Sequence, residues 1–352
     1  MVELSFDKAR CEHCEGVDCL VRCKHLNLDV DTAREEMRKI INGQHSFVLD
    51  RCVTCYACEE YCPFGNHPFY LIVERQEQEG MLLAPRAITK QWINVCEPVG
   101  RYTVGKIQDR ALSLCFLPPF TDLVGGKLFE EIAASFFMGP EFFCNVVYLH
   151  FAKASVIKER LPKIVENIAA LGMKEVVFLH DECYASFKSL APAYGIPVPF
   201  KVTHYYEFLY DRLKQLSGQL KPLNMKVAYQ RPCSSRLIPE TDHYVDDIFS
   251  LIGVERVNRT YDKQNALCCS GLIRINMGLQ GRAMAADNQS KNIEDMLQAG
   301  VEHCVFNCPY CYLALSEKVA AKGVKPIHMI ELCKLALGEE PAKGVMGYGR
   351  YL

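Results

Sequence analysis

Apolar and polar positions follow two different patterns along the chain, and the change falls near residue 110. In the first part, apolar side chains recur at helical spacing over 31–43 and 68–80. Asp31 or Thr32 is the expected N-cap of the first segment, and Gly43 is its expected stop. The pattern therefore predicts an all-helical N-terminal part.

After that change, short apolar runs of the strand type alternate with longer helical patterns. This alternation predicts a parallel α/β layout, in which helices connect neighbouring strands. The expected strands are 111–117, 175–179, 226–230 and 303–307. The expected helices are 158–171, 205–216 and 281–299.

An internal repeat lies within the α/β part. Residues 163–184 align with 291–312 without a gap, and both copies read as helix, glycine, strand and turn. The turn presents its side chains at the carboxyl end of the strand, where open α/β units usually bind ligands. The alignment pairs Gly172 with Gly300, His180 with Cys308, and Cys183 with Cys311.

Together these patterns predict a multidomain α + α/β chain. We expect an α-helical domain over 1–105, two related α/β domains over 106–221 and 222–340, and a C-terminal tail over 341–352. A chain of 352 residues is long enough for this number of domains.

Composition and charge argue against several classes of protein. The 40 basic and 42 acidic residues give a net charge of −2, whereas nucleic-acid binding favours a basic excess. No apolar run reaches the roughly 20 residues of a membrane-spanning helix. The first turn of the N-terminal segment is charged, unlike a secretory signal. We therefore expect a cytoplasmic protein with no membrane span of its own, which could dock on the inner face of a membrane through a partner.

Thirteen of the 19 cysteines fall into three groups. In a reducing compartment, clustered thiols with C-x2-C spacing bind metal more often than they form disulfides. The groups are Cys11-x2-Cys14-x4-Cys19-x3-Cys23, Cys52-x2-Cys55-x2-Cys58-x3-Cys62-Pro63 and Cys233-x34-Cys268-Cys269-x38-Cys308-x2-Cys311.

The first two groups predict two cubane [4Fe–4S] clusters. The spacing of the second group wraps three thiolates around one cluster and sends the fourth, before proline, to a neighbouring cluster. Zinc is the alternative, and it is stronger for the group with the wider Cys14–Cys19 gap. We call this exchange of the fourth thiolate the crossed rule and apply it to both groups. One cluster then takes Cys11, Cys14, Cys19 and Cys62, and the other takes Cys52, Cys55, Cys58 and Cys23.

The third group resembles the cysteine-rich CCG domain, which occurs twice in the catalytic subunit of heterodisulfide reductase. A helical two-cluster ferredoxin module followed by two such domains resembles the D/B-like subunit family of heterodisulfide reductase. This resemblance implies a noncubane [4Fe–4S] cluster that interacts directly with substrate sulfur. One departure is that glycine follows the vicinal pair one residue late, at Gly271. The implied ligands are Cys233, Cys268, Cys269, Cys308 and Cys311.

The first α/β domain lacks a vicinal cysteine pair, so it offers too few thiolates for a noncubane cluster. Its remaining candidates could hold zinc in a mixed Cys/His site, and buried structural cysteines with a satisfied histidine are the alternative. Asp181 and Glu182 beside Cys183 could be acid–base groups, but we expect them to be solvated turn residues. The candidates are Cys115, Cys144, His180 and Cys183.

Two functional hypotheses follow. In the first, an oxygen-sensitive thiol/disulfide oxidoreductase subunit relays single electrons through the cubane clusters to the noncubane cluster, which reduces a small or protein-borne disulfide. In the second, the same clusters only pass electrons between a flavin dehydrogenase and a quinone-side or ferredoxin-side partner. Both hypotheses imply redox partner subunits of the flavoprotein, cytochrome b or hydrogenase type.

Overall fold

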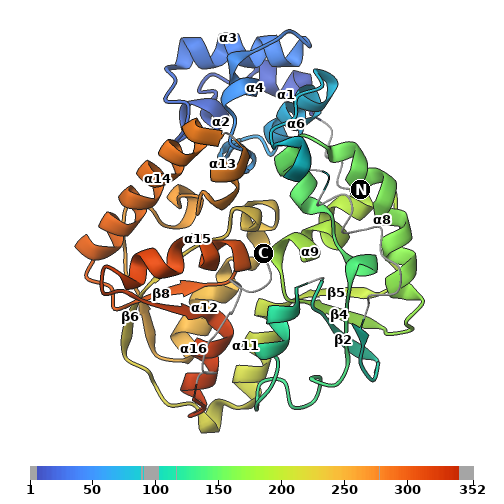
Figure 1. Cartoon of the computed structure of the whole chain (residues 1–352), viewed down its shortest axis with the longest axis vertical. Coiled ribbons are helices and arrows are strands. Elements are labelled where there is room, and N and C mark those ends of the chain that lie inside the picture. Colours follow the sequence, from blue (N-terminus) through green and yellow to red (C-terminus); the bar gives the residue numbers. More distant parts are fainter. Residues whose placement is uncertain (1–5, 89, 91–102, 116, 277, 341–352) are drawn as a thin grey trace.

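The computed structural model describes residues 6–88, 90, 103–115, 117–276 and 278–340. Its N-terminal part, over 6–88, consists of helices and loops with no strand (Figure 1). The helices are α1 (Lys8–Glu12), α2 (Asp18–Val21), α3 (Val30–Ile41), α4 (Phe47–Arg51), α5 (Ala57–Tyr61) and α6 (Pro68–Gln78).

Helices α3 and α6 confirm the two predicted helical segments. The N-cap of α3 is Asp29, however, and not Asp31 or Thr32: the Asp29 carboxylate accepts hydrogen bonds from the Thr32 amide and hydroxyl at 2.9 and 3.0 Å. A carboxylate three residues before the amide has the reach of a capping side chain, so the helix begins earlier than predicted. Gly43 lies just beyond the helix with φ +68°, as its role as a stop requires.

The remainder of the chain forms two mainly parallel sheets. The first has the order β1-β3-β2-β4-β5, in which only β1 is antiparallel, and the second has the parallel order β7-β6-β8-β9. The strands of the first sheet are β1 (Thr103–Val104), β2 (Arg110–Ser113), β3 (Phe136–Met138), β4 (Glu175–Phe178) and β5 (Lys201–His204). Those of the second are β6 (Met225–Tyr229), β7 (Val254–Arg256), β8 (His303–Phe306) and β9 (Lys325–His328).

The two sheets have the same topology once β1 is set aside. The order β3-β2-β4-β5 repeats as β7-β6-β8-β9, in agreement with the predicted internal repeat. The expected strands 111–117, 175–179, 226–230 and 303–307 correspond to β2, β4, β6 and β8. The pattern missed β1, β3 and β7, which have only two or three residues, and β9 carries a proline, which edge strands tolerate.

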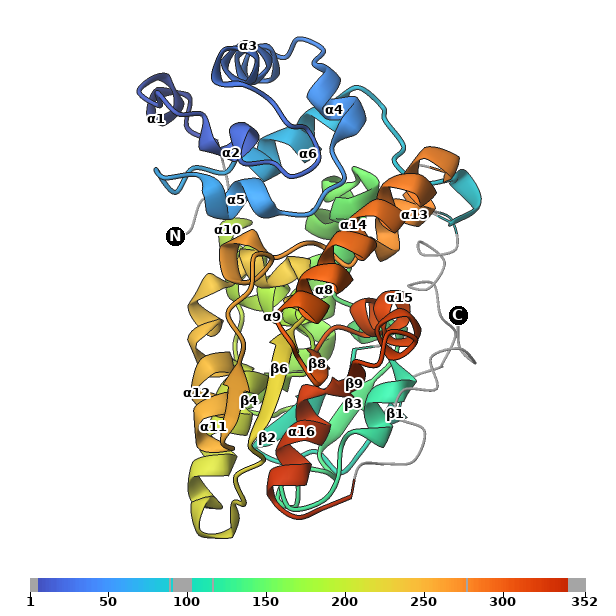
Figure 2. The ribbon, with the colours of Figure 1, turned by 90° about the vertical axis from the view of Figure 1, so that its left-hand side faces the viewer.

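Helices surround both sheets and lie between them (Figures 1 and 2). The predicted helices 158–171, 205–216 and 281–299 are α8, α11 and α14. The helices of the α/β part are α8 (Ala154–Ala169), α9 (Asp181–Ala185), α10 (Ala191–Ala193), α11 (Tyr205–Gln215), α12 (His243–Leu251), α13 (Gly271–Asn276), α14 (Gly278–Gln298), α15 (Pro309–Ala320) and α16 (Met329–Ala336).

One hydrophobic core joins the two sheets. It contains Leu112 and Val177 of the first sheet, Val227 and Val305 of the second, and the apolar faces of α11, α12 and α16. Because the sheets share this core, their strand ends are held in a fixed relation. No helix among the described residues is long and apolar enough to cross a lipid bilayer.

The helical N-terminal part covers one end of the α/β part (Figure 2). Helix α5 packs against the 3-10 turn η6 (Cys233–Leu237), which follows β6. The cysteine-bearing loops at the carboxyl end of the second sheet therefore face the helical part. The predicted domain border after residue 105 lies close to residues 91–102, which are outside the described residues. The predicted tail at 341–352 is also outside them.

Candidate metal centres

The first thiol group lies among α1, α2 and α5. Burial and the neighbouring thiols of Cys14 and Cys62 raise the pKa of Cys11 to about 11. Burial and the thiols of Cys62, Cys11 and Cys14 likewise raise the pKa of Cys19. Mutually repelling thiolates at one place need a compensating cation, so this donor set fits a metal cluster.

The second thiol group lies beside the first. Burial and the thiols of Cys55 and Cys23 raise the pKa of Cys52 to about 12, although the Thr54 amide opposes the shift. Cys58 interacts with Cys52 and Cys55, and it also interacts with Cys19 of the first group. The structure thus brings together the two sets of four thiols that the crossed rule predicted, and their role as ligands stays a prediction.

Backbone conformations that L-residues rarely adopt occur beside these cysteines. Val17, Thr54 and Tyr56 have φ values of +46°, +54° and +61°. Such strain costs free energy and concentrates at functional sites. At Thr54 it turns the amide toward the Cys52 Sγ, to which the amide donates a hydrogen bond at 3.4 Å. Amides that point at sulfur are typical of iron–sulfur loops.

The third group contains five thiols in one continuous arrangement. Cys233 contacts Cys268, the vicinal Cys269 contacts Cys311, and Cys311 contacts Cys308. Ser270 has φ +62°, and its amide donates to the Cys268 Sγ at 3.4 Å, which repeats the arrangement at Thr54. None of the described cysteines is in a disulfide. This set of converging free thiols fits a cluster ligand set.

Cys55 connects the second group with the third. Burial raises its pKa, but a hydrogen bond to His25 and the positive charges of His25 and Arg236 outweigh burial and lower it, while Cys268 opposes them. His25 also interacts with both Cys55 and Cys268. The three thiol groups therefore follow one another through space, from Cys11 at one end to Cys308 at the other.

The first α/β domain carries a smaller thiol group in the equivalent place. The sulfur atoms of Cys115, Cys144 and Cys183 lie within 4.8 Å of one another. The three residues follow β2, β3 and β4, just as the five-thiol group follows β6, β7 and β8. All three are 1–2% exposed. Their arrangement can offer a thiophilic cation three ligands in a closed pocket.

His180, the fourth predicted member of that group, lies near it but contacts the other site. Burial lowers its pKa, yet contact with Cys308 and the charges of Glu182 and Asp181 outweigh burial and raise the pKa to about 10. The side chain also interacts with Cys115. Its Nε2 is buried and has no partner among the described residues.

Asp181 was expected to be a solvated turn residue, and this prediction is wrong. It is fully buried, because its carboxylate accepts hydrogen bonds from His204 Nε2 at 2.9 Å and from Asn307 Nδ2 at 3.2 Å. The Glu182 side chain is only 14% exposed. Because Asn307 directly precedes Cys308, Asp181 links the end of β4 to the end of β8.

Two buried arginines fix the five-thiol group against the helical part. Arg231 Nη1 and Arg236 Nε lie 2.7 and 3.2 Å from Glu60 Oε2, between Cys58 and Cys62 in the sequence. Arg231 also pairs with Asp242 at 2.5 Å. The two arginines are visible in the sequence as the segment RPCSSR around Cys233. Their partner Glu60, however, lies 171 positions before Arg231.

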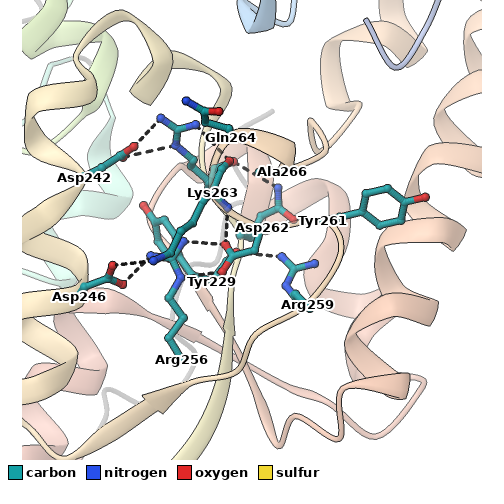
Figure 3. Close-up of polar contacts among 12 residues, drawn as sticks. Tyr229, Asp242, Asp246, Arg256, Arg259, Tyr261, Asp262, Lys263, Gln264 and Ala266 are labelled. Atoms are coloured by element: carbon teal, nitrogen blue, oxygen red, sulfur yellow. Dashed lines mark hydrogen bonds and ion pairs between the residues drawn. The ribbon is translucent and has the colours of Figure 1, made fainter. Parts of the chain in front are cut away.

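The loop before the vicinal cysteines is held by a polar network (Figure 3). Arg256 donates to Asp262 at 2.6 and 2.9 Å and to Asp246 at 2.7 Å. Further along the loop, Gln264 binds α2 and α5: its side chain accepts from Arg22, and its carbonyl accepts from the Tyr61 hydroxyl at 2.9 Å. This loop therefore has a fixed path into the five-thiol group.

Comparison with known proteins shows what this chain is similar to. No protein-family model matches the chain. The D subunit of dihydromethanophenazine:CoB–CoM heterodisulfide reductase from Methanosarcina acetivorans is 27% identical over 295 residues, which cover 74% of this chain and 70% of that protein. The homologous protein of Methanosarcina mazei is 26% identical over 181 residues, which cover 50% of this chain and 44% of that protein.

The B subunit of fumarate reductase (CoM/CoB) from Methanothermobacter marburgensis is 27% identical over 180 residues. The match covers 48% of this chain but only 34% of that protein, about a third of its length. These homologues define an oxidoreductase-subunit class of the heterodisulfide reductase type. They confirm the resemblance to the D/B-like subunit family of heterodisulfide reductase.

A solved structure supports the fold alone. A hypothetical protein from Helicobacter pylori superimposes with a TM-score of 0.53 at 12% identity. The match covers 80% of this chain and 60% of that protein. At this identity the likeness indicates shared architecture and no shared activity.

Proposed function

We propose that this chain is the iron–sulfur subunit of a heterodisulfide-reductase-like thiol/disulfide oxidoreductase. The observation that carries the proposal is the continuous order of the three thiol groups. Cys58 interacts with Cys19, and Cys55 interacts with Cys268, so each group adjoins the next. Electrons would enter at the first cubane cluster, pass to the second and arrive at the five-thiol group.

The five-thiol group would hold a noncubane [4Fe–4S] cluster, which supplies an iron site for substrate sulfur and takes up electrons one at a time. The chain's own contribution is position and exclusion of water. The Arg231 and Arg236 pair with Glu60 holds Cys233 at a fixed distance from the helical part. The Arg256 network holds the path of the loop to Cys268.

The three-thiol group would hold one thiophilic cation such as zinc. Its support is the mutual approach of Cys115, Cys144 and Cys183 in a buried pocket. Burial and the neighbouring thiols raise the pKa of Cys144 and of Cys183, so three thiolates at this place would need a positive charge beside them. This site would supply structure rather than electrons, because zinc does not change its oxidation state.

The proposed setting is a larger redox complex, with a flavoprotein, cytochrome b or hydrogenase-type subunit as electron donor. The relatives named above are themselves called subunits. The competing function is electron relay between a flavin dehydrogenase and a quinone-side or ferredoxin-side partner, without disulfide cleavage. Both functions use the cubane clusters, and they differ only at the five-thiol group.

The test is the response of that group to a disulfide. Anaerobically purified protein is poised half-reduced, a small disulfide is added, and EPR spectra are recorded. Disulfide reduction predicts a change in one cluster signal, which Cys269→Ala abolishes while both cubane signals remain. If neither disulfides nor polysulfides alter any signal, the relay function is the better account.

A further inference from the structure

His180 occupies the place in the first α/β unit that Cys308 occupies in the second. Each lies two residues after the last residue of the equivalent strand and directly precedes a helix, α9 or α15. Their backbones are both extended, with φ and ψ of −132° and 134° at His180 and −84° and 131° at Cys308. Symmetry alone would therefore assign His180 to the thiol group of its own unit.

The His180 ring instead contacts the Cys308 thiol of the other unit. The contact has a structural cause in the next residue. Asp181 accepts hydrogen bonds from His204 and Asn307, and Asn307 directly precedes Cys308. The two strand ends are thereby held face to face, and His180 lies between the three-thiol and five-thiol groups.

One atom of this ring has no partner. His180 is only 5% exposed, yet its Nε2 makes no hydrogen bond to any described residue. A buried polar group without a partner destabilises the folded state, so native proteins rarely leave one unless a ligand or water supplies the partner. An unpaired nitrogen beside a group of reactive thiols therefore indicates where a ligand atom would lie.

We propose that His180 is a substrate-contacting residue of the five-thiol site, and this inference rests on the proposed function. His180 Nε2 donates a hydrogen bond to a substrate sulfur. In the reaction the S–S bond of a small disulfide would break on taking up two electrons, which bound cubane clusters would supply, and two thiolates would form. His180 keeps its proton and stabilises the negative charge on one thiolate, which takes a proton from solvent after it leaves.

A second role for the same residue makes a different prediction. If His180 were the fourth ligand of a cation held by Cys115, Cys144 and Cys183, its loss would reduce the content of that cation. A hydrogen-bond donor to substrate leaves the metal content unchanged. The two roles are therefore separated by metal analysis, without any assay of activity.

The experiment compares His180→Leu, His180→Gln and the matched control His303→Gln in the full chain, purified without oxygen. Iron and zinc are measured first. 2-Mercaptoethanol, a product-type thiol, is then titrated against the oxidised protein while the EPR signal of the third cluster is followed. A hydrogen bond to a charged sulfur predicts roughly 10- to 100-fold weaker thiol binding in His180→Leu.

His180→Gln keeps an N–H donor and should regain part of that affinity, and His303→Gln should match the wild type. The cubane signals serve as the check on folding. The inference is overturned if His180→Leu binds the thiol as the wild type does, or if it loses zinc or iron. A wild-type protein that responds to neither thiol nor disulfide overturns the proposed function and, with it, this inference.

Discussion

The two α/β units have one topology but different thiol groups at the same strand ends. The second unit places five cysteines after β6, β7 and β8, and the first places three after β2, β3 and β4. The first unit has Cys144 where the second has the pair Cys268 and Cys269, and it has His180 where the second has Cys308. Loss of two thiols thus changes a candidate cluster site into a candidate site for a single cation.

The difference extends to how each site is held. Arg231 and Arg236 flank Cys233 and pair with Glu60 of the helical part. No arginine flanks Cys115 in this way, and apolar residues surround the three-thiol group. The first unit contacts the same cubane loops through a neutral network instead, in which the His150 ring lies 2.8 and 3.0 Å from the Thr54 and Tyr56 hydroxyls.

The largest expected effect separates the two sites by their metal. Cys269→Ala should remove the third cluster, so that iron falls from about twelve to about eight per chain, because each cluster holds four. Cys144→Ala, at the equivalent place in the first unit, should leave iron unchanged. Anaerobic iron and sulfide analysis measures both. Equal loss of iron from the two variants would contradict the assigned difference.

The second prediction concerns the cation of the three-thiol group. Treatment of the wild type with a strong zinc chelator should lower its free energy of unfolding by about 3 kcal/mol or more, because bound structural metal contributes directly to folding. Cys183→Ser, which lacks one ligand, should have the lower free energy of unfolding from the start, and the chelator should change it little. Urea unfolding monitored by circular dichroism measures both. If the wild type contains no zinc and its free energy of unfolding does not change with the chelator, this site is refuted.

Local patterns in the sequence were enough to predict much of this comparison. Cysteine spacing within a loop, strand and helix periodicity, and the gapless match of 163–184 to 291–312 all depend on nearby residues. The structure has α8 and α14 of 16 and 21 residues, so the two copies of the repeat differ in helix length. Side chains match in the local alignment because the strand and turn have equal lengths.

The contacts that join the two units to each other and to the helical part could not be predicted. They form between distant segments, which leave no local pattern in the sequence. The approach of His180 to Cys308 follows from the sharing of Asp181 between the two units, across 126 positions to Asn307. A charged residue in a polar turn reads as solvated unless its distant partners are known. For the same reason, Glu60 gave no sign of its two arginine partners.

The third prediction tests whether fixation of the five-thiol group depends on Glu60. Glu60→Gln leaves two buried arginines without their shared carboxylate, so we expect a loss of about 3 kcal/mol in the free energy of unfolding. The matched change Asp246→Asn affects an ion pair whose carboxylate is 46% exposed, so the expected cost is below about 1 kcal/mol. Chemical denaturation measures both. Equal losses would show that Glu60 has no special role.

The smallest effect compares two histidines at equivalent places, His204 at the end of β5 and His328 at the end of β9. Each accepts a hydrogen bond from the amide two residues later, but His204 Nε2 faces the Asp181 carboxylate, whereas His328 Nε2 donates to the Asn307 carbonyl at 3.1 Å. Burial lowers the pKa of His328 from 6.5 to about 4. The neutral ring is therefore the form that the folded chain requires.

Between pH 6.5 and pH 4 the unfolded chain binds a proton at His328 that the folded chain does not bind. Stability must then fall as the pH falls through this window, by about 2 kcal/mol between pH 7 and pH 5. His328→Gln should show a shallower fall, although the loss of the cap lowers its stability at pH 7. The comparison uses the difference between the two proteins at each pH, so that acid loss of clusters common to both cancels. If the free energy of unfolding falls equally with pH in the wild type and in His328→Gln, His328 is not the group that titrates.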